Sequence, residues 1–245
     1  MRDQHYDLDI APSFMSYEFV SEGPKGRITK LIKYTETEEK GFYNLGFGDK
    51  IEESEEFEDT IISDNKDSER VLATVAATVY LFTKHYPNTY VYAKGSNNAR
   101  TRLYRIGLSN HLEVIETDFN LFGYINSKWE TYQKNRDYTA FNHKKIDNMK
   151  KIAKESDLKS PIIKIKESLS KYDTMPVFQK KTDKASAFLK KHPPFEAIKE
   201  MENNSIQTYF NEGKTFSEIS VLVRLSETEV ALRLTDMGLL FVEKV

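Results

Sequence analysis

The chain has 245 residues, with 36 Lys or Arg, 38 Asp or Glu and a formal net charge of -2. Apolar residues make up 39% and charged residues 30%, which is typical of a globular protein and too apolar for whole-chain disorder. It has no Cys, which excludes disulfide scaffolds, Cys-based zinc sites, iron–sulfur sites and thiol nucleophiles. The N-terminus lacks the apolar stretch of a signal peptide, and the longest uncharged run, 71–83, is far shorter than the roughly 20 residues that span a bilayer. We therefore expect a cytoplasmic protein with no membrane partner.

The near-zero net charge hides regions of opposite sign. Residues 1–148 have a net charge of -5, residues 149–191 of +7, and residues 192–245 of -4. A basic strip between acidic regions has two interpretations: it binds nucleic acid, or it packs on the acidic N-terminal region of the same chain. We expect intramolecular packing, and we leave nucleic acid, a nucleotide and a second copy of the chain open as partners. The expected parts of the chain are 1–148, 149–194 and 195–245.

The N-terminal part predicts an α+β domain with an antiparallel-rich sheet and two helices. Alternating apolar residues from Tyr17 to Phe47, with a turn signal at 22–26, predict three strands. The acidic run 52–59 predicts a solvated loop. The remaining elements follow from apolar periodicity and from Pro and Gly positions. They are a helix from about 68 to Pro87, a strand at 90–93, a helix from about 99 to 106 or 112, and strands at 119–125 and 138–146, with the helices on one face of the sheet.

Beyond Ile146 strand patterns vanish and an all-α region is expected. One helical stripe consists of Ile162, Ile165, Leu169 and Tyr172. A second consists of Ala185, Phe188 and Leu189, and Pro193-Pro194 ends it.

The end of the chain resembles small bacterial helix-turn-helix domains. The resemblance rests on Gly213-Lys214-Thr215-Phe216-Ser217-Glu218-Ile219, Ser226, Val230, Arg233-Leu234 and Gly238-Leu239. We expect Ile219, Leu222, Val230 and Leu234 to point inward. The recognition helix would carry Glu227, Glu229 and Asp236 against a lone Arg233, which argues against DNA binding because phosphate contacts need cations. DNA binding and a partner-docking or structural role both stay open.

One polar cluster follows a buried strand and opens a helix. Gly95 permits the turn, and the free N–H groups and dipole of a helix N-terminus favour an anion. Arg suits bidentate phosphate contacts. In the alternative interpretation the arginines pair with the acidic run 52–59, Asp64 or Asp67. The candidate phosphate- or nucleic-acid-binding residues are Lys94, Ser96, Arg100, Arg102, Tyr104 and Arg105.

Other catalytic and cofactor patterns are missing from the sequence. The five His residues show no metal-ligand spacing, no Gly-x-Ser-x-Gly occurs, and the phosphate-loop pattern is not matched. Gly46-x-Gly48 alone is too short for a dinucleotide fingerprint. We therefore predict no metal and no cofactor, and we leave open whether the chain is an enzyme and which residues would be catalytic.

Five motifs occur in order between residues 14 and 146 and together resemble a bacterial family known as a domain of unknown function. They are Gly23-Pro24-Lys25-Gly26, Tyr43-Asn44-Leu45-Gly46-Phe47-Gly48-Asp49, Asp67, Val71-Leu72-Ala73-Thr74-Val75, and Lys94-Gly95-Ser96 with Ala99-Arg100-Thr101-Arg102-Leu103-Tyr104. The family implies no activity. Residues 149–191 resemble the small Lys-rich protein that tends to sit beside it.

The resemblance implies a fusion of two neighbours, in the manner of a toxin–antitoxin or phage-defence pair. We therefore expect a toxin-like, phosphate- or nucleic-acid-directed domain held by an antitoxin-like helical region. The alternatives are a non-enzymatic protein-interaction module and a regulator that binds DNA through the C-terminal helix-turn-helix.

Overall fold

The computed structural model describes residues 5–51, 57–58, 64–146, 161–174 and 176–240. Within these residues the strands are β1 (Leu8–Ile10), β2 (Ser16–Gly23), β3 (Gly26–Glu36), β4 (Phe42–Lys50), β5 (Phe57–Glu58), β6 (Tyr90–Ala93), β7 (Phe119–Ile125), β8 (Lys128–Thr131), β9 (Ala140–Lys145) and β10 (Ile163–Ile165). The helices are α1 (Ser68–His85), α2 (Asn98–Asn110), α3 (Leu112–Asp118), the 3-10 helix η1 (Glu167–Thr174), α4 (Pro176–Lys191), α5 (Pro194–Asn211), α6 (Phe216–Val223) and α7 (Glu227–Asp236).

All these strands belong to one mixed sheet with the order β10-β1-β2-β3-β4-β6-β9-β7-β8, and β5 pairs with β4. Neighbours are antiparallel except for β1 with β10 and β4 with β6. The β4–β6 pair is parallel because α1 carries the chain back between them, as a parallel crossover requires. The expected α+β domain with an antiparallel-rich sheet, followed by a helical region, is confirmed.

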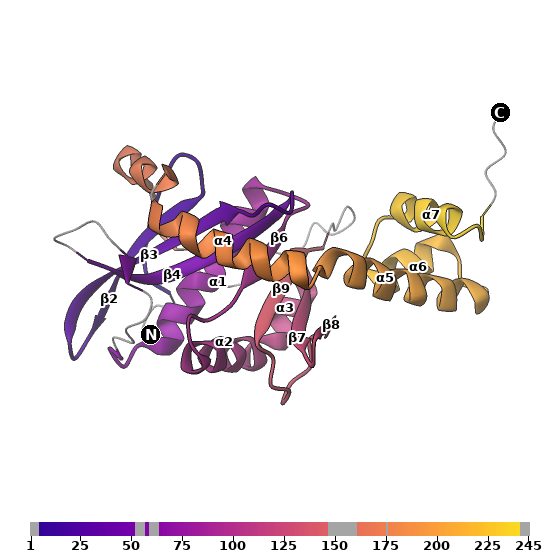
Figure 1. Ribbon diagram of the computed structural model, residues 1–245, viewed down its shortest axis with the longest axis horizontal. Coiled ribbons are helices and arrows are strands. Elements are labelled where there is room, and N and C mark those ends of the chain that lie inside the picture. The colour runs from indigo at the N-terminus through magenta and orange to yellow at the C-terminus, as the bar shows by residue number, and fades with distance from the viewer. Residues whose placement is uncertain (1–4, 52–56, 59–63, 147–160, 175, 241–245) are drawn as a thin grey trace.

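Helices cover both faces of the sheet. On β3, Ile32 and Tyr34 pack in one cluster with residues of α1, whereas Leu31 packs in another with Tyr172 and Phe178. On β6, Val91 packs with the α1 cluster, whereas its neighbours pack with α4 residues. Successive side chains of a strand point to opposite faces, so α1 and α4 lie on opposite sides. Figure 1 shows α4 crossing in front of the strands.

Within the N-terminal part, α1, α2 and α3 pack on one face of the sheet, as expected. The second face is covered by η1 and α4, which lie outside the N-terminal part. The second N-terminal helix is divided at His111 into α2 and α3. The predicted order also omitted β1, β5, β8 and β10, which are at most four residues long and carry little periodicity.

The stripe Ile162–Tyr172 is not a helical face. Ile163–Ile165 forms β10, which pairs with β1, and Ile162 and Ile165 are 61% and 53% exposed. Only Leu169 and Tyr172 of this stripe are buried, because they lie in η1. The spacing fitted a helix, but the backbone hydrogen bonds to β1 decide the conformation.

The three C-terminal helices form a small unit around its own core of Ile206, Ile219, Val230 and Leu234. Thr215 caps α6 in a capping box with Glu218, and Ser226 caps α7. Leu222 was expected to point inward but is 48% exposed. The short helix α6 directs Ile219 to the core, and Leu222 lies on its outer side. In Figure 1, α5 extends this unit beyond the edge of the sheet.

Within the described part of the chain, none of the helices has both the length and the apolar character that crossing a membrane requires.

Candidate functional site

The turn from β6 into α2 is tightly built. A Cβ atom on Gly95 would lie 2.3 Å from the backbone nitrogen of Thr101, so no side chain fits there. Asn97 caps α2, and its side chain accepts a hydrogen bond from the backbone N–H of Arg100 at 2.9 Å. Gly95 and Asn97 thus place the first turn of α2 directly beside the end of the buried strand.

The six predicted phosphate-binding residues divide into two groups. Arg100 is 7% exposed, and its Nη1 donates to the backbone oxygen of Phe47 at 3.2 Å. Arg105 forms an ion pair with Asp137 at 2.6 Å, and Tyr104 packs on the core cluster that includes Leu112. These three side chains make contacts within the protein.

The other three predicted residues, Lys94, Ser96 and Arg102, are exposed. The Nζ atom of Lys94 lies 4.6 Å from the ring centroid of Phe188 on α4. Tyr104 packs on the face of the sheet opposite to the one where Lys94 contacts Phe188. The six side chains therefore do not converge on one point. The acidic run 52–59, the predicted alternative partner of the arginines, lies outside the described residues apart from the backbone of β5.

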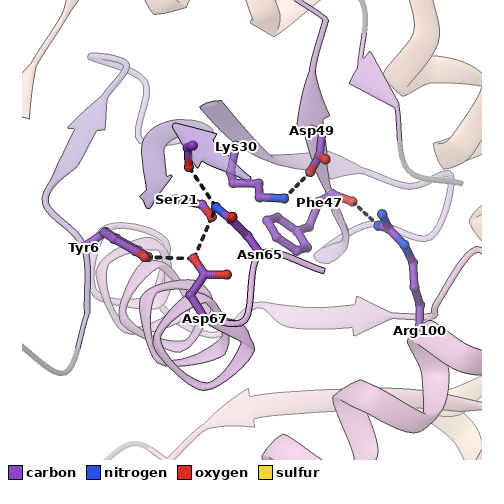
Figure 2. Close-up of polar contacts among 9 residues, drawn as sticks. Tyr6, Ser21, Lys30, Phe47, Asp49, Asn65, Asp67 and Arg100 are labelled. Atoms are coloured by element: carbon purple, nitrogen blue, oxygen red, sulfur yellow. Dashed lines mark hydrogen bonds and ion pairs between the residues drawn. The ribbon is translucent and has the colours of Figure 1, made fainter. Parts of the chain in front are cut away.

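A polar network joins the β2–β3 hairpin to the start of α1 (Figure 2). Asp67 accepts hydrogen bonds from the hydroxyls of Tyr6 at 2.8 Å and Ser21 at 2.6 Å. Asn65 donates to Ser21 Oγ and to the backbone oxygen of Gly26, each at 3.0 Å. Burial and the neighbouring carboxylate raise the pKa of Tyr6, so its hydroxyl keeps the proton that it donates. This network fixes the hairpin relative to α1.

The motifs that carry the family resemblance meet around this network. The Gly23–Gly26 turn lies against Asn65, since a Cβ on Gly23 would be 1.9 Å from the Asn65 backbone oxygen. Asp49 forms an ion pair with Lys30, which is 5% exposed, and Figure 2 shows Arg100 reaching the strand that carries Asp49. These contacts give the motifs a structural role: they hold the β2–β3 hairpin, strand β4 and helices α1 and α2 together.

The other face of the sheet holds an aromatic box, which we define as Tyr92, Tyr124 and Trp129. The partly buried ring of Phe188 on α4 packs against it, with centroid distances of 5.6, 4.9 and 6.5 Å to the three rings. Lys94 lies over the same Phe188 ring. Edge-to-face and tilted ring pairs of this kind each contribute about 0.5–1.5 kcal/mol beyond the area they bury.

Hydrogen bonds fix the C-terminal end of α4 beside the box. Trp129 Nε1 donates to the backbone oxygen of His192 at 3.0 Å, and Tyr124 Oη lies 2.6 Å from His192 Nδ1. Farther along α4, Ser186 Oγ accepts from the backbone N–H of Glu38 at 3.1 Å. The helix is therefore held by ring contacts and by polar contacts at several points.

Asn142 on β9 faces the same covered region. It pairs across the sheet with Tyr92 on β6 and with Phe122 on β7, and both of these side chains pack in the cluster with α4. Asn142 is fully buried, and neither atom of its amide has a hydrogen-bond partner among the described residues. A buried unpaired amide costs stability, so this position calls for an explanation.

In the C-terminal unit, α7 presents its acidic groups and not a cation. Arg233 is 7% exposed, and it pairs with Glu229 at 2.7 Å and with Glu202 at 3.2 Å. Arg224 donates to the backbone oxygen of Glu116 on α3. The Arg233 guanidinium is therefore occupied by ion pairs within the C-terminal unit.

A family model described as Family of unknown function (DUF6934) matches residues 2–146. The chain belongs to this family. No curated protein and no solved structure matches the chain. The matched region holds β1 to β9 and α1 to α3, while η1 and α4 lie outside it. The family domain therefore contributes strands β1 to β9 and the aromatic box, and the segment after it contributes the edge strand β10 and the cover.

Sequence reasoning missed the box and Asn142. The sequence indicates only a strand at 90–93 and a helical stripe that includes Phe188. The pairing of β6 with β9, which brings these side chains together, joins residues about fifty positions apart. A single sequence gives no signal for that pairing.

Proposed function

We propose that the family domain of this chain is a binding module whose sheet face receives an amphipathic basic helix, and that α4 is the helix the chain itself supplies. The observation that carries the proposal is the packing of the partly buried Phe188 ring against the aromatic box of Tyr92, Tyr124 and Trp129. Phe188 contacts residues from three strands of the family domain, as a side chain of a helix-in-groove complex does.

Apolar burial supplies most of the binding in this proposal. Ala185, Leu189 and Ile198 are at most 5% exposed and pack in the same cluster as the box. Burying such side chains contributes about 25 cal/mol per Å² of apolar area. Exposed ion pairs contribute only about 0–1 kcal/mol each, so the opposite charges of domain and segment act mainly by steering.

The proposal extends to the class of system. A domain held by a basic helical segment is the arrangement expected of a toxin-like domain and an antitoxin-like segment. The resemblance of residues 149–191 to the Lys-rich neighbour of the family supports this extension. In such a system the segment controls the activity of the domain by covering this face of its sheet.

The test cuts the chain after it has folded. A protease recognition sequence is inserted between residues 147 and 160 of the full chain, and the purified protein is cleaved and passed over a sizing column. We expect the two fragments to elute together, also at about 1 M salt, where charge attraction is screened beyond roughly 3 Å.

Two variants identify the contact that holds the fragments. Phe188→Asp places a charge in the aromatic box and is expected to separate the fragments. Leu232→Asp, the same change at a 55% exposed position of α7, is expected to leave them together. Separation of the unmodified fragments, or full retention with Phe188→Asp, would overturn the proposal.

A further inference from the structure

Asn142 is a polar group held in an apolar place. Its flanking partners across the sheet are Tyr92 and Phe122, and its own side chain is fully buried. Among the described residues neither Oδ1 nor Nδ2 is hydrogen-bonded. An aliphatic residue of the same size would avoid the desolvation cost of an unpaired amide. The amide at this position therefore points to a ligand whose donors and acceptors it pairs with.

The aromatic box lies directly beside this amide, because Tyr92 is both a wall of the box and the cross-strand partner of Asn142. The present occupant of the box is a planar ring, that of Phe188. This ring meets the walls tilted or edge-on, with interplanar angles of 37°, 78° and 85° to Tyr92, Tyr124 and Trp129. A nucleobase is also planar and aromatic, so the same walls can accept it, and such contacts tolerate any base. An Asn amide offers one acceptor and two donors, which match the edge of a base.

Cations border the box on the same face. Lys94 Nζ lies over the Phe188 ring, and Lys144 Nζ lies 5.1 Å from the ring centroid of Tyr90. Lys144 is two residues from Asn142 on β9 and so shares its face of the sheet. Lysines beside a stacking surface are suited to the phosphates that adjoin a bound base.

We propose that the aromatic box and Asn142 form a binding site for one base of a single-stranded nucleic acid, with Lys94 and Lys144 on the adjoining phosphates, and that Phe188 of α4 blocks it. The inference rests on the proposed function, since α4 has to be a cover that can leave. The family domain thus carries the nucleic-acid site, and the segment after it is autoinhibitory.

The experiment uses the full chain and a labelled single-stranded RNA of mixed sequence at low salt. Phe188→Ala empties the box of its ring, and we expect it to bind the RNA at least about tenfold more tightly than the unmodified chain. Trp129 is the only Trp of the chain and lines the box, so its fluorescence is expected to be quenched on binding. Stacking of a base at any other surface would leave that signal unchanged.

Further variants assign the contacts. In the Phe188→Ala background, Asn142→Leu is expected to reverse the gain in affinity, and Lys94→Gln to lower the slope of log affinity against log salt by about one. Phe216→Ala, which removes a partly buried ring of the C-terminal unit, is the matched control and is expected to leave RNA binding unchanged.

Two results separate this inference from the proposed function. If Phe188→Ala loosens the cleaved fragments on the sizing column but RNA changes neither the anisotropy nor Trp129 fluorescence, the nucleic-acid site is refuted and the helix-binding function stands. If the unmodified cleaved fragments separate, or if Phe188→Asp leaves them fully together, both fail. Should Phe188→Ala not fold, Phe188→Leu removes the planar ring with less loss of volume and decides the question in the same assays.

Discussion

The pair Lys33–Asp173 gives a direct test of how η1 is held on the sheet. Lys33 on β3 is 2% exposed, and its Nζ lies 2.5 Å from Asp173 Oδ1 and 3.1 Å from Ser16 Oγ. Burial lowers the pKa of Lys33, while Asp173 opposes that shift. Asp173→Ala removes the counter-charge and leaves the ammonium group with one hydroxyl partner.

The expected cost follows from the burial of the two side chains. Breaking a fully buried pair costs about 3–5 kcal/mol. Asp173 is 27% exposed, and Lys33 can lose its proton, so both solvent and deprotonation limit the penalty. We expect Asp173→Ala to lower the free energy of unfolding by about 2–3 kcal/mol, and Lys33→Met combined with Asp173→Ala to recover most of it.

Urea unfolding at pH 7 compares the unmodified chain with Asp173→Ala and with the double variant. The three proteins are compared at equal slope of free energy against urea, so that a shift of the midpoint reports stability. The reasoning is refuted if Asp173→Ala stays within about 0.5 kcal/mol of the unmodified chain, or if the double variant is no more stable than the single one.

Three further predictions concern His143, Gly95 and Arg233. Burial lowers the pKa of His143 from 6.5 to about 4, so between these pH values only the unfolded chain takes up the proton, and the free energy of unfolding falls as pH falls. His143→Phe should remove up to about 3 kcal/mol of that loss, measured by urea unfolding at pH 7 and pH 4.5. The same loss of stability between the two pH values in both proteins would contradict this prediction. Gly95→Ala sets a Cβ against the backbone of α2 and should lower the stability by about 1–3 kcal/mol in thermal melts. The control Gly107→Ala places its Cβ against the end of the Leu72 side chain and should be neutral or stabilising in the same assay. Equal effects of the two substitutions would show that the turn at Gly95 can relax. Arg233→Met leaves Glu202 buried without its guanidinium partner and should destabilise the C-terminal unit by about 2–4 kcal/mol, and adding Glu202→Gln should restore stability. Hydrogen exchange of the C-terminal helices measures the effect. Unchanged protection in Arg233→Met would show that the ion pair is dispensable.

Local patterns in the sequence were sufficient for the longer elements. The spacing of Val71 and Val75, with Pro87 after them, predicts α1, and the Gly23–Gly26 turn is where β2 pairs with β3. The run at 90–93 coincides with β6, and the helix-turn-helix pattern coincides with α5, α6 and α7. These elements are determined by side-chain periodicity and by capping and turn residues that lie close together in the chain.

Only the tertiary structure decided which surfaces those elements share. Ile163–Ile165 is a strand because β1 offers a hydrogen-bonding edge, although the spacing of its neighbours fits a helix. The sequence left open whether the arginines of α2 bind phosphate or form ion pairs within the protein. In the structure Arg100 reaches the backbone of Phe47 and Arg105 reaches Asp137, because the packing of α2 directs each side chain separately. The aromatic box beside Phe188 and the unpaired Asn142 depend on strands and a helix that come together only when the strands pair and α4 covers the sheet. Cross-strand register is a property of the folded chain that local sequence does not specify.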